Sequence, residues 1–262
     1  MSNSNGCSTG TTEEKKECVK EFVVSDKFKI MIDEAFENTK AILKQRCDDL
    51  KKWGYDQEHE FSTIFGIGGN ELITMKYYSP GQQIDPDDAK PTPQNTPSEI
   101  EVYAYDFMRD GVERLLSICN LIKVGDRAYD ENSKFYRYGN FLNETALTLG
   151  AARISKGQTL NALPDKYKDR IHVEILHRFT EINKVTGLDS RVSTLCHELS
   201  HLVIYKENGV YYGGMGTDDI IPKGIKKTND NYTKHAKNLL QKKSKHVFNN
   251  AYNIEKYFEI KI

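Results

Sequence analysis

The chain has 262 residues, of which 38% are hydrophobic and 29% charged, a balance typical of a soluble globular protein with a sizeable core. Its 37 basic and 38 acidic side chains leave a formal charge of -1, so no global field favours nucleic acid or an anionic membrane as a partner. No run approaches the roughly 18 consecutive apolar residues that a membrane span needs.

Residues 1–26 are predicted to form a flexible tail, because they are rich in Ser, Asn, Gly and Thr and contain the charged run EEKKE. They lack the basic and apolar regions of a secretory signal. We therefore expect the protein to stay in the cytoplasm or to be exported by a route that needs no such signal. The five cysteines form no C-x-x-C pair, and their odd number leaves at least one unpaired, which favours reduced, buried thiols.

Two helices are predicted in the first half of a single domain that spans residues 27–262. Apolar residues recur at helical spacing from Asp26 to Trp53, and Gly54 can end the element. The glycines of FSTIFGIGG predict a turn, since the lysine of a phosphate-binding loop is missing. Residues 79–98 hold five of the seven prolines and predict a long surface loop. The next segment, EIEVYAYDFMRDGVERLLSICNLI, carries an apolar stripe that predicts a second helix packed on the first.

The second half combines strand, hairpin and helix patterns. In RIHVEILHRF, residues 170–179, apolar and polar side chains alternate, which predicts a strand at the edge of a small sheet. The segment YKENGVYYGG has an Asn-Gly turn between tyrosine-bearing flanks and predicts a hairpin that borders the cleft. Residues 231–260 predict two lysine-rich helices whose charged faces are solvated and have no nucleic-acid role.

The string LCHELSHLV is typical of a zinc-hydrolase helix. At a spacing of four residues, His197 and His201 share one helix face and can bind one ion, with Glu198 beside them. The ion would lower the pKa of a water molecule, and Glu198 would act as the general base. The flanking residues are uncharged, and Asp189 or Ser190 can cap the helix. The alternative is an ordinary helix whose histidines are satisfied by hydrogen bonds.

Two histidines make an incomplete catalytic site, because such a zinc ion usually takes three protein ligands. Downstream, GGMGTDDI offers Asp218 and Asp219 in a tight glycine-rich turn, from which a short carboxylate could reach the metal. A turn aspartate that bonds its own backbone is the competing interpretation, and the local chemistry leaves both open.

Together, GLDSRVSTLCHELSHLV and GTDD resemble the aspzincins, the deuterolysin and lysine-specific metalloendopeptidase family. In that family a Gly-Thr-x-Asp turn supplies the third ligand, so the resemblance implies Asp219 as the ligand and Asp218 as the variable position. IDEAFENTKAIL with STIFG, and FNNAYNIEKYFE, extend the likeness over residues 27–262, weakly between 66 and 165. The resemblance implies an α+β, zincin-like domain, mainly helical with a small mixed sheet, and one catalytic Zn²⁺.

The chain departs from the family where a tyrosine helps to polarise the scissile carbonyl. In place of its Tyr-Gly pair, the sequence DDIIPKG has proline and lysine. Lys223 could supply positive charge to a developing oxyanion, as could a phenol from Tyr211, Tyr212 or Tyr232. The sequence does not choose among these four side chains.

A second departure concerns specificity. Lysine-specific members bind the substrate ammonium with an aspartate and a glutamate three residues apart, and here those positions are Tyr252 and Glu255. Half of the ammonium site is lost, so a strict preference for lysine is not implied. Glu255 could still favour a basic side chain, or be a surface carboxylate beside Lys256. The cysteines do not reproduce the disulfides of the family's secreted members.

The leading hypothesis is a zinc metalloendopeptidase that cuts protein or peptide substrates, with a strand near Ile171 to Ile175 pairing with the extended substrate. An exported effector or toxin would explain a protease without a secretory signal. Two other classes stay open: a zinc amidase acting on a non-protein amide, and a catalytically weak zincin that acts as a binding protein. Retention of Glu198 argues against the last, because a scaffold needs no base. The sequence does not define an oligomeric state.

Overall fold

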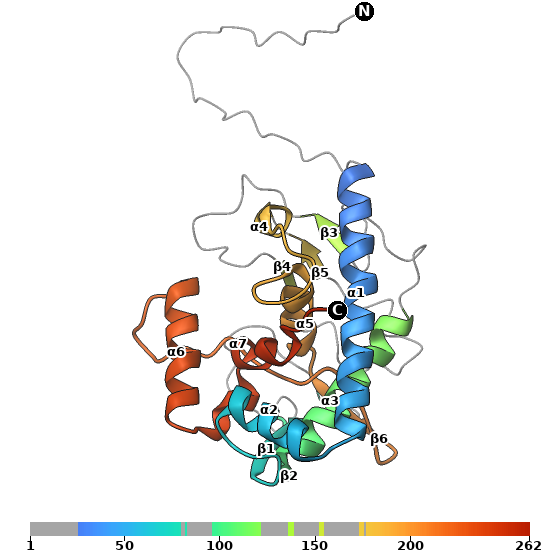
Figure 1. The fold of residues 1–262 in the computed structure, drawn as a ribbon. Coiled ribbons are helices and arrows are strands. Elements are labelled where there is room, and N and C mark those ends of the chain that lie inside the picture. Colours follow the sequence, from blue (N-terminus) through green and yellow to red (C-terminus); the bar gives the residue numbers. More distant parts are fainter. Residues whose placement is uncertain are drawn as a thin grey trace, which may run out of the picture.

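The computed structural model describes residues 26–79, 82, 96–121, 136–138, 152–154, 173–175 and 177–262. A long helix, α1 (Asp26–Lys51), runs along one side of the molecule, and α3 (Ala104–Leu121) and α5 (Arg191–Ser200) both pack against it (Figure 1). The two predicted amphipathic helices and their mutual packing are therefore confirmed. The glycine at 54 follows the end of α1 as expected.

The second helix in the chain, α2 (Tyr55–Phe65), ends at a glycine in the left-handed conformation. Gly66 has φ 74°, and its N–H donates to the carbonyl oxygen of Ser62 at 2.8 Å. A side chain is disfavoured at such a φ, so glycine is the residue that this helix end selects. The turn predicted for FSTIFGIGG thus begins only at Gly66, and its first five residues are helical.

The prediction of a helix from residue 99 onward is wrong for its first turn. Residues Ser98–Tyr103 form strand β2, which pairs antiparallel with β1 (Leu72–Tyr77), and α3 starts only at Ala104. The sequence SEIEVY alternates charged and β-branched residues, which is the period of a strand. Most of the predicted proline-rich loop, residues 79–98, lies outside the described residues.

Strand β5 (Val173–Ile175) lies in the middle of a three-stranded sheet. It pairs parallel with β3 (Tyr136–Tyr138) and antiparallel with β4 (Ala152–Ile154). The expectation that residues 170–179 form an edge strand is therefore wrong, and α4 (His177–Glu181) occupies the end of that segment. An alternating pattern predicts a strand but does not reveal its neighbours, which come from distant parts of the chain.

The predicted hairpin is present. Strands β6 (Ile204–Glu207) and β7 (Val210–Gly213) pair antiparallel and are joined by Asn208 and Gly209, whose φ angles are 50° and 82°. Positive φ at both central residues is the geometry of a type I′ turn, which Asn-Gly favours. The hairpin leads the chain from the end of α5 back towards the same helix.

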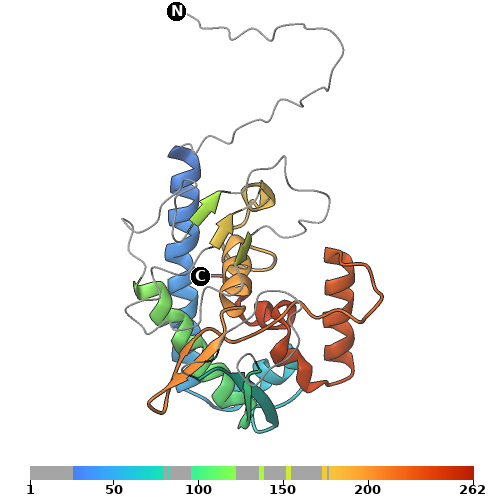
Figure 2. The same cartoon turned by 180° about the vertical axis from the view of Figure 1, so that it is seen from behind.

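The C-terminal region consists of α6 (Asn229–Gln241), η4 (Lys245–Asn249), α7 (Ala251–Ile254) and η5 (Glu255–Phe258). The first predicted lysine-rich helix is confirmed as α6, whereas the second is divided into three short turns. Figures 1 and 2 place α6 and α1 on opposite sides of the molecule.

A buried arginine ties the last of these turns to the rest of the fold. The Arg46 guanidinium donates two hydrogen bonds to Glu60, at 3.0 and 2.9 Å, and lies 4.1 Å from the ring centroid of Tyr257. Its Nε also donates to the backbone carbonyl oxygen of Tyr257. These contacts join α1, α2 and η5, so the segment that carries Glu255 is held in a fixed position.

The described residues form an α+β structure in which helices predominate, as expected. Cys47, Cys119 and Cys196 are buried and unpaired, in agreement with the reduced thiols predicted, whereas Cys7 and Cys18 lie outside the described residues. None of the described helices is long and apolar enough to cross a bilayer. A zincin-like fold remains a prediction.

Candidate metal centre

The helix that carries the two histidines begins at a capping box. The Ser190 hydroxyl accepts from the backbone N–H of Ser193 at 3.1 Å, and the Ser193 hydroxyl accepts from that of Ser190 at 3.0 Å. Ser190 is therefore the cap, rather than Asp189. Most of α5 is buried in the core, as its uncharged flanks predicted. A helix buried in this way has little freedom to move the side chains that it carries.

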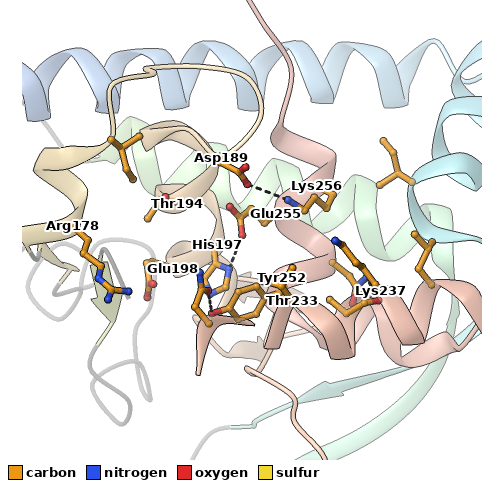
Figure 3. A pocket seen from close by; sticks show the side chains of 16 residues that line it. Arg178, Asp189, Thr194, His197, Glu198, Thr233, Lys237, Tyr252, Glu255 and Lys256 are labelled. Atoms are coloured by element: carbon orange, nitrogen blue, oxygen red, sulfur yellow. Dashed lines mark hydrogen bonds and ion pairs between the residues drawn. The ribbon is translucent and has the colours of Figure 1, made fainter. Parts of the chain in front are cut away.

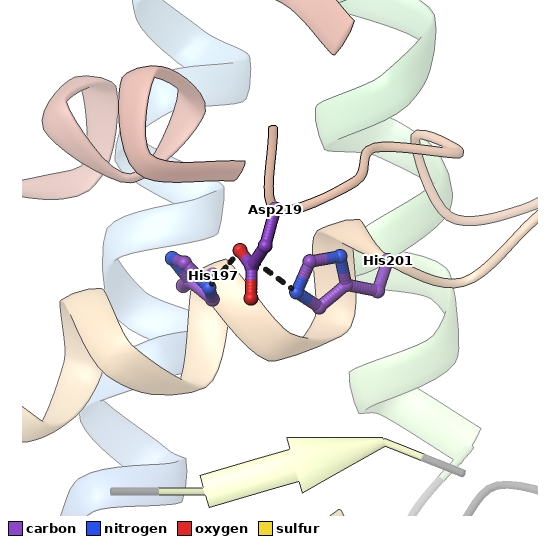
Figure 4. Close-up of side chains that lie close together, drawn as sticks. All are labelled: His197, His201 and Asp219. Carbon is purple, nitrogen blue, oxygen red and sulfur yellow. Dashed lines mark ion pairs between the residues drawn. The ribbon is translucent and has the colours of Figure 1, made fainter. Parts of the chain in front are cut away.

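The structure brings His197, His201 and Asp219 together (Figure 4). His201 is the C-cap of α5 but keeps helical angles, φ -67° and ψ -21°, so the spacing of four residues still aligns the two rings. Nε2 of His197 lies 3.2 Å from Oδ1 of Asp219, and Nε2 of His201 lies 3.6 Å from the same oxygen. Both imidazoles therefore direct the same ring nitrogen at one carboxylate.

Asp219 is placed by a segment that packs closely on the end of α5. The N–H of Thr217 donates to the carbonyl of Ser200 at 3.1 Å, and the two hydroxyls of this pair are 2.6 Å apart. A Cβ on Gly214 would lie 2.5 Å from the carbonyl oxygen of Leu202, so only glycine permits this approach. The glycines of GGMGTDDI thus bring the third carboxylate to the histidines.

The neighbouring aspartate fixes the other side of this turn. The backbone N–H of Asp218 donates to the carbonyl of Asn249 at 2.8 Å, and its carbonyl accepts from the N–H of Ala251 at 3.1 Å. These two bonds tie the turn to the C-terminal segment. Asp219, and not Asp218, is the member of the pair that faces both imidazoles, as the resemblance implied.

The second nitrogen of each imidazole is also held by the protein. Nδ1 of His197 lies 3.2 Å from Oε2 of Glu255, and Oε1 of that carboxylate accepts from the Ser193 hydroxyl at 3.1 Å. Nδ1 of His201 donates to the carbonyl oxygen of Thr217 at 3.0 Å. Because both acceptors require a proton on Nδ1, the free lone pair of each neutral ring is on Nε2, which faces Asp219.

Glu255 lines a cavity beside this site and is not the surface carboxylate that was one of the two sequence expectations, while its substrate-binding role stays a prediction. Its side chain is 14% exposed and bonds to His197 and Ser193. Burial favours the protonated form, but the hydrogen bond and charge of His197 outweigh it and lower the pKa of Glu255. Glu255 is therefore an ionised partner of a histidine. Glu255 and His197 are 58 residues apart in the chain, so no local sequence pattern reveals their contact.

The charges around the two rings favour a cation. Burial lowers the pKa of His197, but its hydrogen bonds to Asp219 and Glu255 outweigh burial and raise the pKa well above the usual value. The pKa of His201 is lowered by burial and by the charge of His197. In the metal-free protein the imidazolium of His197 thus lies between the carboxylates of Asp219 and Glu255. A metal ion bound at Nε2 would replace its positive charge.

The donor set and its spacing fit zinc. In a tetrahedral site with zinc–ligand bonds near 2.1 Å, two ligand atoms lie about 3.4 Å apart. The distances of 3.2 and 3.6 Å from Asp219 to the two Nε2 atoms bracket this value, and all three ligand atoms lie within 4.8 Å of one another. Two imidazoles and one carboxylate are a common zinc ligand set that leaves a position open.

A cavity of about 450 Å³ lies beside these residues, with His197 and Glu198 in its wall (Figure 3). Its other lining residues come from α2, α4, α5, α6, α7 and η5 and from the segment between α4 and α5. The described lining residues include none from the β6–β7 hairpin, so the expectation that the hairpin borders this cleft is wrong. Glu198 is buried but accessible to a ligand in the cavity, which is the position that a general base needs.

Tyr252 lines the cavity next to the histidines. Its ring lies edge-on to His197 at a centroid distance of 4.8 Å and stacks on Tyr232 at 5.3 Å. Its hydroxyl donates to Oδ1 of Asn229 at 2.9 Å. Burial and the charges of Asp219 and Glu255 raise the pKa of Tyr252, so the phenol keeps its proton.

Among the four candidates for oxyanion stabilisation, Tyr232 lies near the site, because it stacks on Tyr252 and its pKa is raised by burial and by the charge of Asp219. Lys223 is exposed and does not line the cavity. Tyr211 packs against Tyr77 at 5.6 Å and against Lys206, and Tyr212 neighbours it on β7. Of the side chains proposed from the sequence for substrate binding or oxyanion stabilisation, Tyr252 and Glu255 line the cavity with His197 and Glu198, whereas His201 and Asp219 are not among its described lining residues.

Comparison of the chain with protein families, curated proteins and solved structures finds no match. Membership of the aspzincin family therefore stays a prediction from the sequence motifs. The geometry of His197, His201, Asp219 and Glu198 is the structural basis for a function.

Proposed function

We propose that this protein is a zinc-dependent metalloendopeptidase with His197, His201 and Asp219 as zinc ligands and Glu198 as general base. The observation that carries the proposal is the convergence of two Nε2 atoms on one Asp219 oxygen, at 3.2 and 3.6 Å, beside a cavity whose wall includes His197 and Glu198. Hydrogen bonds on both Nδ1 atoms orient the rings for that task, as is usual for zinc-binding histidines.

In this mechanism a zinc ion held by the three ligands would act as a Lewis acid and lower the pKa of a water molecule towards neutrality. Glu198 accepts the proton of the attacking water and passes it to the leaving amine. Glu255 and the Thr217 carbonyl keep the two imidazoles in their tautomers throughout. The phenol of Tyr252, whose ring lies 4.8 Å from that of His197, keeps its proton and would donate a hydrogen bond to the developing oxyanion in exchange for its hydrogen bond to Asn229.

A polypeptide substrate fits the setting of the site. Helix α6 contributes five of the residues that line the cavity, and β4, an outer strand of the described sheet, contacts α5. An outer strand offers free backbone groups with which a peptide can pair. We therefore propose that the substrate pairs with β4 and not with the residues near Ile171 to Ile175, because β5 already has a neighbouring strand on both sides.

The test is to measure zinc content and casein cleavage for the wild-type chain and for Glu198→Gln. We expect about one zinc ion in each protein and a loss of cleavage of at least about 10³-fold in the variant, since the base is removed but the ligands remain. Glu113→Gln, an exposed carboxylate on α3 that pairs with Lys51, is the matched control and should cut as the wild type does.

Two results would redirect the assignment. Zinc in both proteins without cleavage of any denatured protein would favour an amidase that acts on a non-protein amide with the same ligands. Equal cleavage by the wild type and Glu198→Gln would refute the mechanism, because no other carboxylate of the described cavity wall neighbours His197 in the helix.

A further inference from the structure

A strip of lysines runs beside the candidate site. Between residues 223 and 245 the chain contains eight lysines and a single acidic residue, Asp230, which give this stretch a formal charge of +7. Because the whole chain carries -1, the remaining residues sum to -8. The lysine strip consists of Lys223, Lys226, Lys227, Lys234, Lys237, Lys242, Lys243 and Lys245. The near-neutral total therefore conceals a strongly polarised molecule.

All eight side chains of the lysine strip belong to exposed residues. Among the described residues, Lys245 is the one member of the strip that forms an ion pair, with Glu71 at 3.8 Å. The positive field of the strip is therefore little neutralised by the protein itself. It covers α6 and the segments on either side of it, on the side of the molecule opposite α1 (Figures 1 and 2).

The lysine strip is continuous with the cavity. Helix α6 lines the cavity with Asn229, Thr233, Ala236 and Leu240, which recur at helical spacing, while its other faces carry lysines. Lys237 belongs to both, since it is exposed and also lines the cavity (Figure 3). Lys237 is therefore the member of the strip that a ligand in the cavity meets first.

The described cavity wall itself is balanced in formal charge, with Asp189, Glu198 and Glu255 against Arg178, Lys237 and Lys256, so the excess of positive charge lies in the rest of the strip, outside the cavity. Glu255, the carboxylate that could have attracted a basic side chain, is already bonded to His197 and Ser193. Arg178 contributes a further cation to the wall on the α4 side. The pKa of His235 on α6 is lowered by burial and then by the charges of Lys242 and His246. The positive charge of the strip therefore acts on this imidazole.

We propose that the substrates are polypeptide segments rich in Asp and Glu, which the lysine strip captures and directs into the cavity. This inference rests on the proposed peptidase function, whose substrate class it specifies. Charged patches of one sign raise the local concentration of an oppositely charged ligand and increase its association rate by about 10- to 1,000-fold at low salt. The preference thus runs opposite to the basic specificity that the resemblance suggested.

The chemistry of the strip favours an acidic polypeptide over nucleic acid. Residues 223–245 contain no arginine, the side chain that best matches phosphate geometry. Their one aromatic residue, Tyr232, is buried against Tyr252 and offers no exposed ring for stacking on a base. Lysine ammonium groups instead act as point charges, which suits flexible carboxylate side chains.

The test uses two fluorogenic peptides that share one cleavable core and differ only in a flanking run of glutamates or of glutamines. At about 10 mM salt we expect the acidic peptide to have a kcat/KM at least about tenfold higher. At about 150 mM salt the ratio should fall several-fold, since the Debye length shortens from about 30 Å to about 8 Å. Equal rates for the two peptides at low salt would overturn the inference and leave the peptidase assignment standing.

Charge-reversal variants locate the effect. The double variant Lys226→Glu and Lys234→Glu should bring the ratio of the two peptides to about one or below. The matched control, Lys27→Glu and Lys44→Glu, makes the same charge change at exposed lysines of α1 on the other side of the molecule and should keep the ratio. Equal losses in both variants would show a net-charge effect and refute a role for the strip.

A binding measurement separates this inference from the peptidase proposal. Fluorescence anisotropy of the labelled acidic peptide is recorded with Glu198→Gln, so that binding is observed whether or not the wild type cleaves. Binding that is lost in the strip variant but kept in the α1 variant supports the strip, even if no peptide is cut. A labelled single-stranded oligonucleotide of equal charge that binds about tenfold more tightly than the peptide would assign the strip to nucleic acid instead.

Discussion

Glu255 provides the sharpest test of the site, because two functions predict different effects of its removal. Its carboxylate bonds to Nδ1 of His197 at 3.2 Å and accepts from Ser193 at 3.1 Å, with 14% of the side chain exposed. Removing such a hydrogen-bonded partner of a metal-binding histidine lowers metal affinity by about 10- to 100-fold. We expect Glu255→Ala to weaken zinc binding by a factor within this range.

The isosteric variant should lose less. In Glu255→Gln the amide oxygen can still accept from His197, but the negative charge that supports the imidazole is gone, so we expect about a tenfold loss. Zinc affinity is measured by competition with a chromophoric chelator. Glu259→Gln is the matched control, since this carboxylate lies one turn further on, bonds to Lys256 at 2.8 Å and does not contact His197.

A substrate-binding role predicts another outcome. If Glu255 bound the ammonium group of a substrate, both variants would keep the zinc affinity of the wild type and raise KM only for peptides with a basic side chain. Zinc affinities of Glu255→Ala and the wild type that agree within about twofold would therefore refute the positioning role argued from the structure.

Three further predictions concern the same centre. Tyr252→Phe should lower kcat by about 10- to 100-fold with zinc content unchanged, because it removes a hydroxyl donor and not a ligand, and Tyr232→Phe is its control. Gly214→Ala should weaken zinc binding, since its Cβ would meet a carbonyl oxygen at 2.5 Å and displace the turn that carries Asp219; equilibrium dialysis with zinc checks this. The raised pKa of His197 means that zinc binding at pH 7 should release about one proton and weaken as the pH falls, as calorimetry in buffers of different ionisation enthalpy would show. In the metal-free protein that raised pKa stabilises the fold below about pH 6.5, and this contribution is lost as the pH rises through the folded-state value.

The parts of the site that a single element determines were predictable from the sequence. His197, Glu198 and His201 share one helix, so their relative positions follow from its period and its cap at Ser190. Asp219 is 18 residues beyond His201. Local chemistry does not distinguish Asp219 from Asp218 as the third ligand, and only the resemblance to a family motif does. The selection of Asp219 needed the tight packing of the glycine turn on α5, which is a tertiary contact.

The sequence predicts an element well where a long periodic pattern repeats, and poorly where the structure of a short segment depends on the strand with which it pairs. The period of α1 extends over 26 residues and gave its start and nearly its end. By contrast, residues 98–103 and 173–175 are short, and their roles depend on pairing with β1, and with β3 and β4. Propensity is weak in such segments, so the partner strand determines whether they extend and whether they lie at an edge.

The role of Glu255 links the structure of the centre to its specificity. The carboxylate that a resemblance would assign to the substrate is used to orient His197, and the same buried environment keeps the adjacent phenol of Tyr252 protonated. A carboxylate bonded in this way has part of its acceptor capacity and charge taken up by His197 and Ser193, which weakens its attraction for a substrate ammonium. Groups that the metal centre does not use can then dominate selectivity. Among the described groups beside the cavity, the exposed lysines of α6 and its flanking segments meet that condition, and they select for acidic polypeptides.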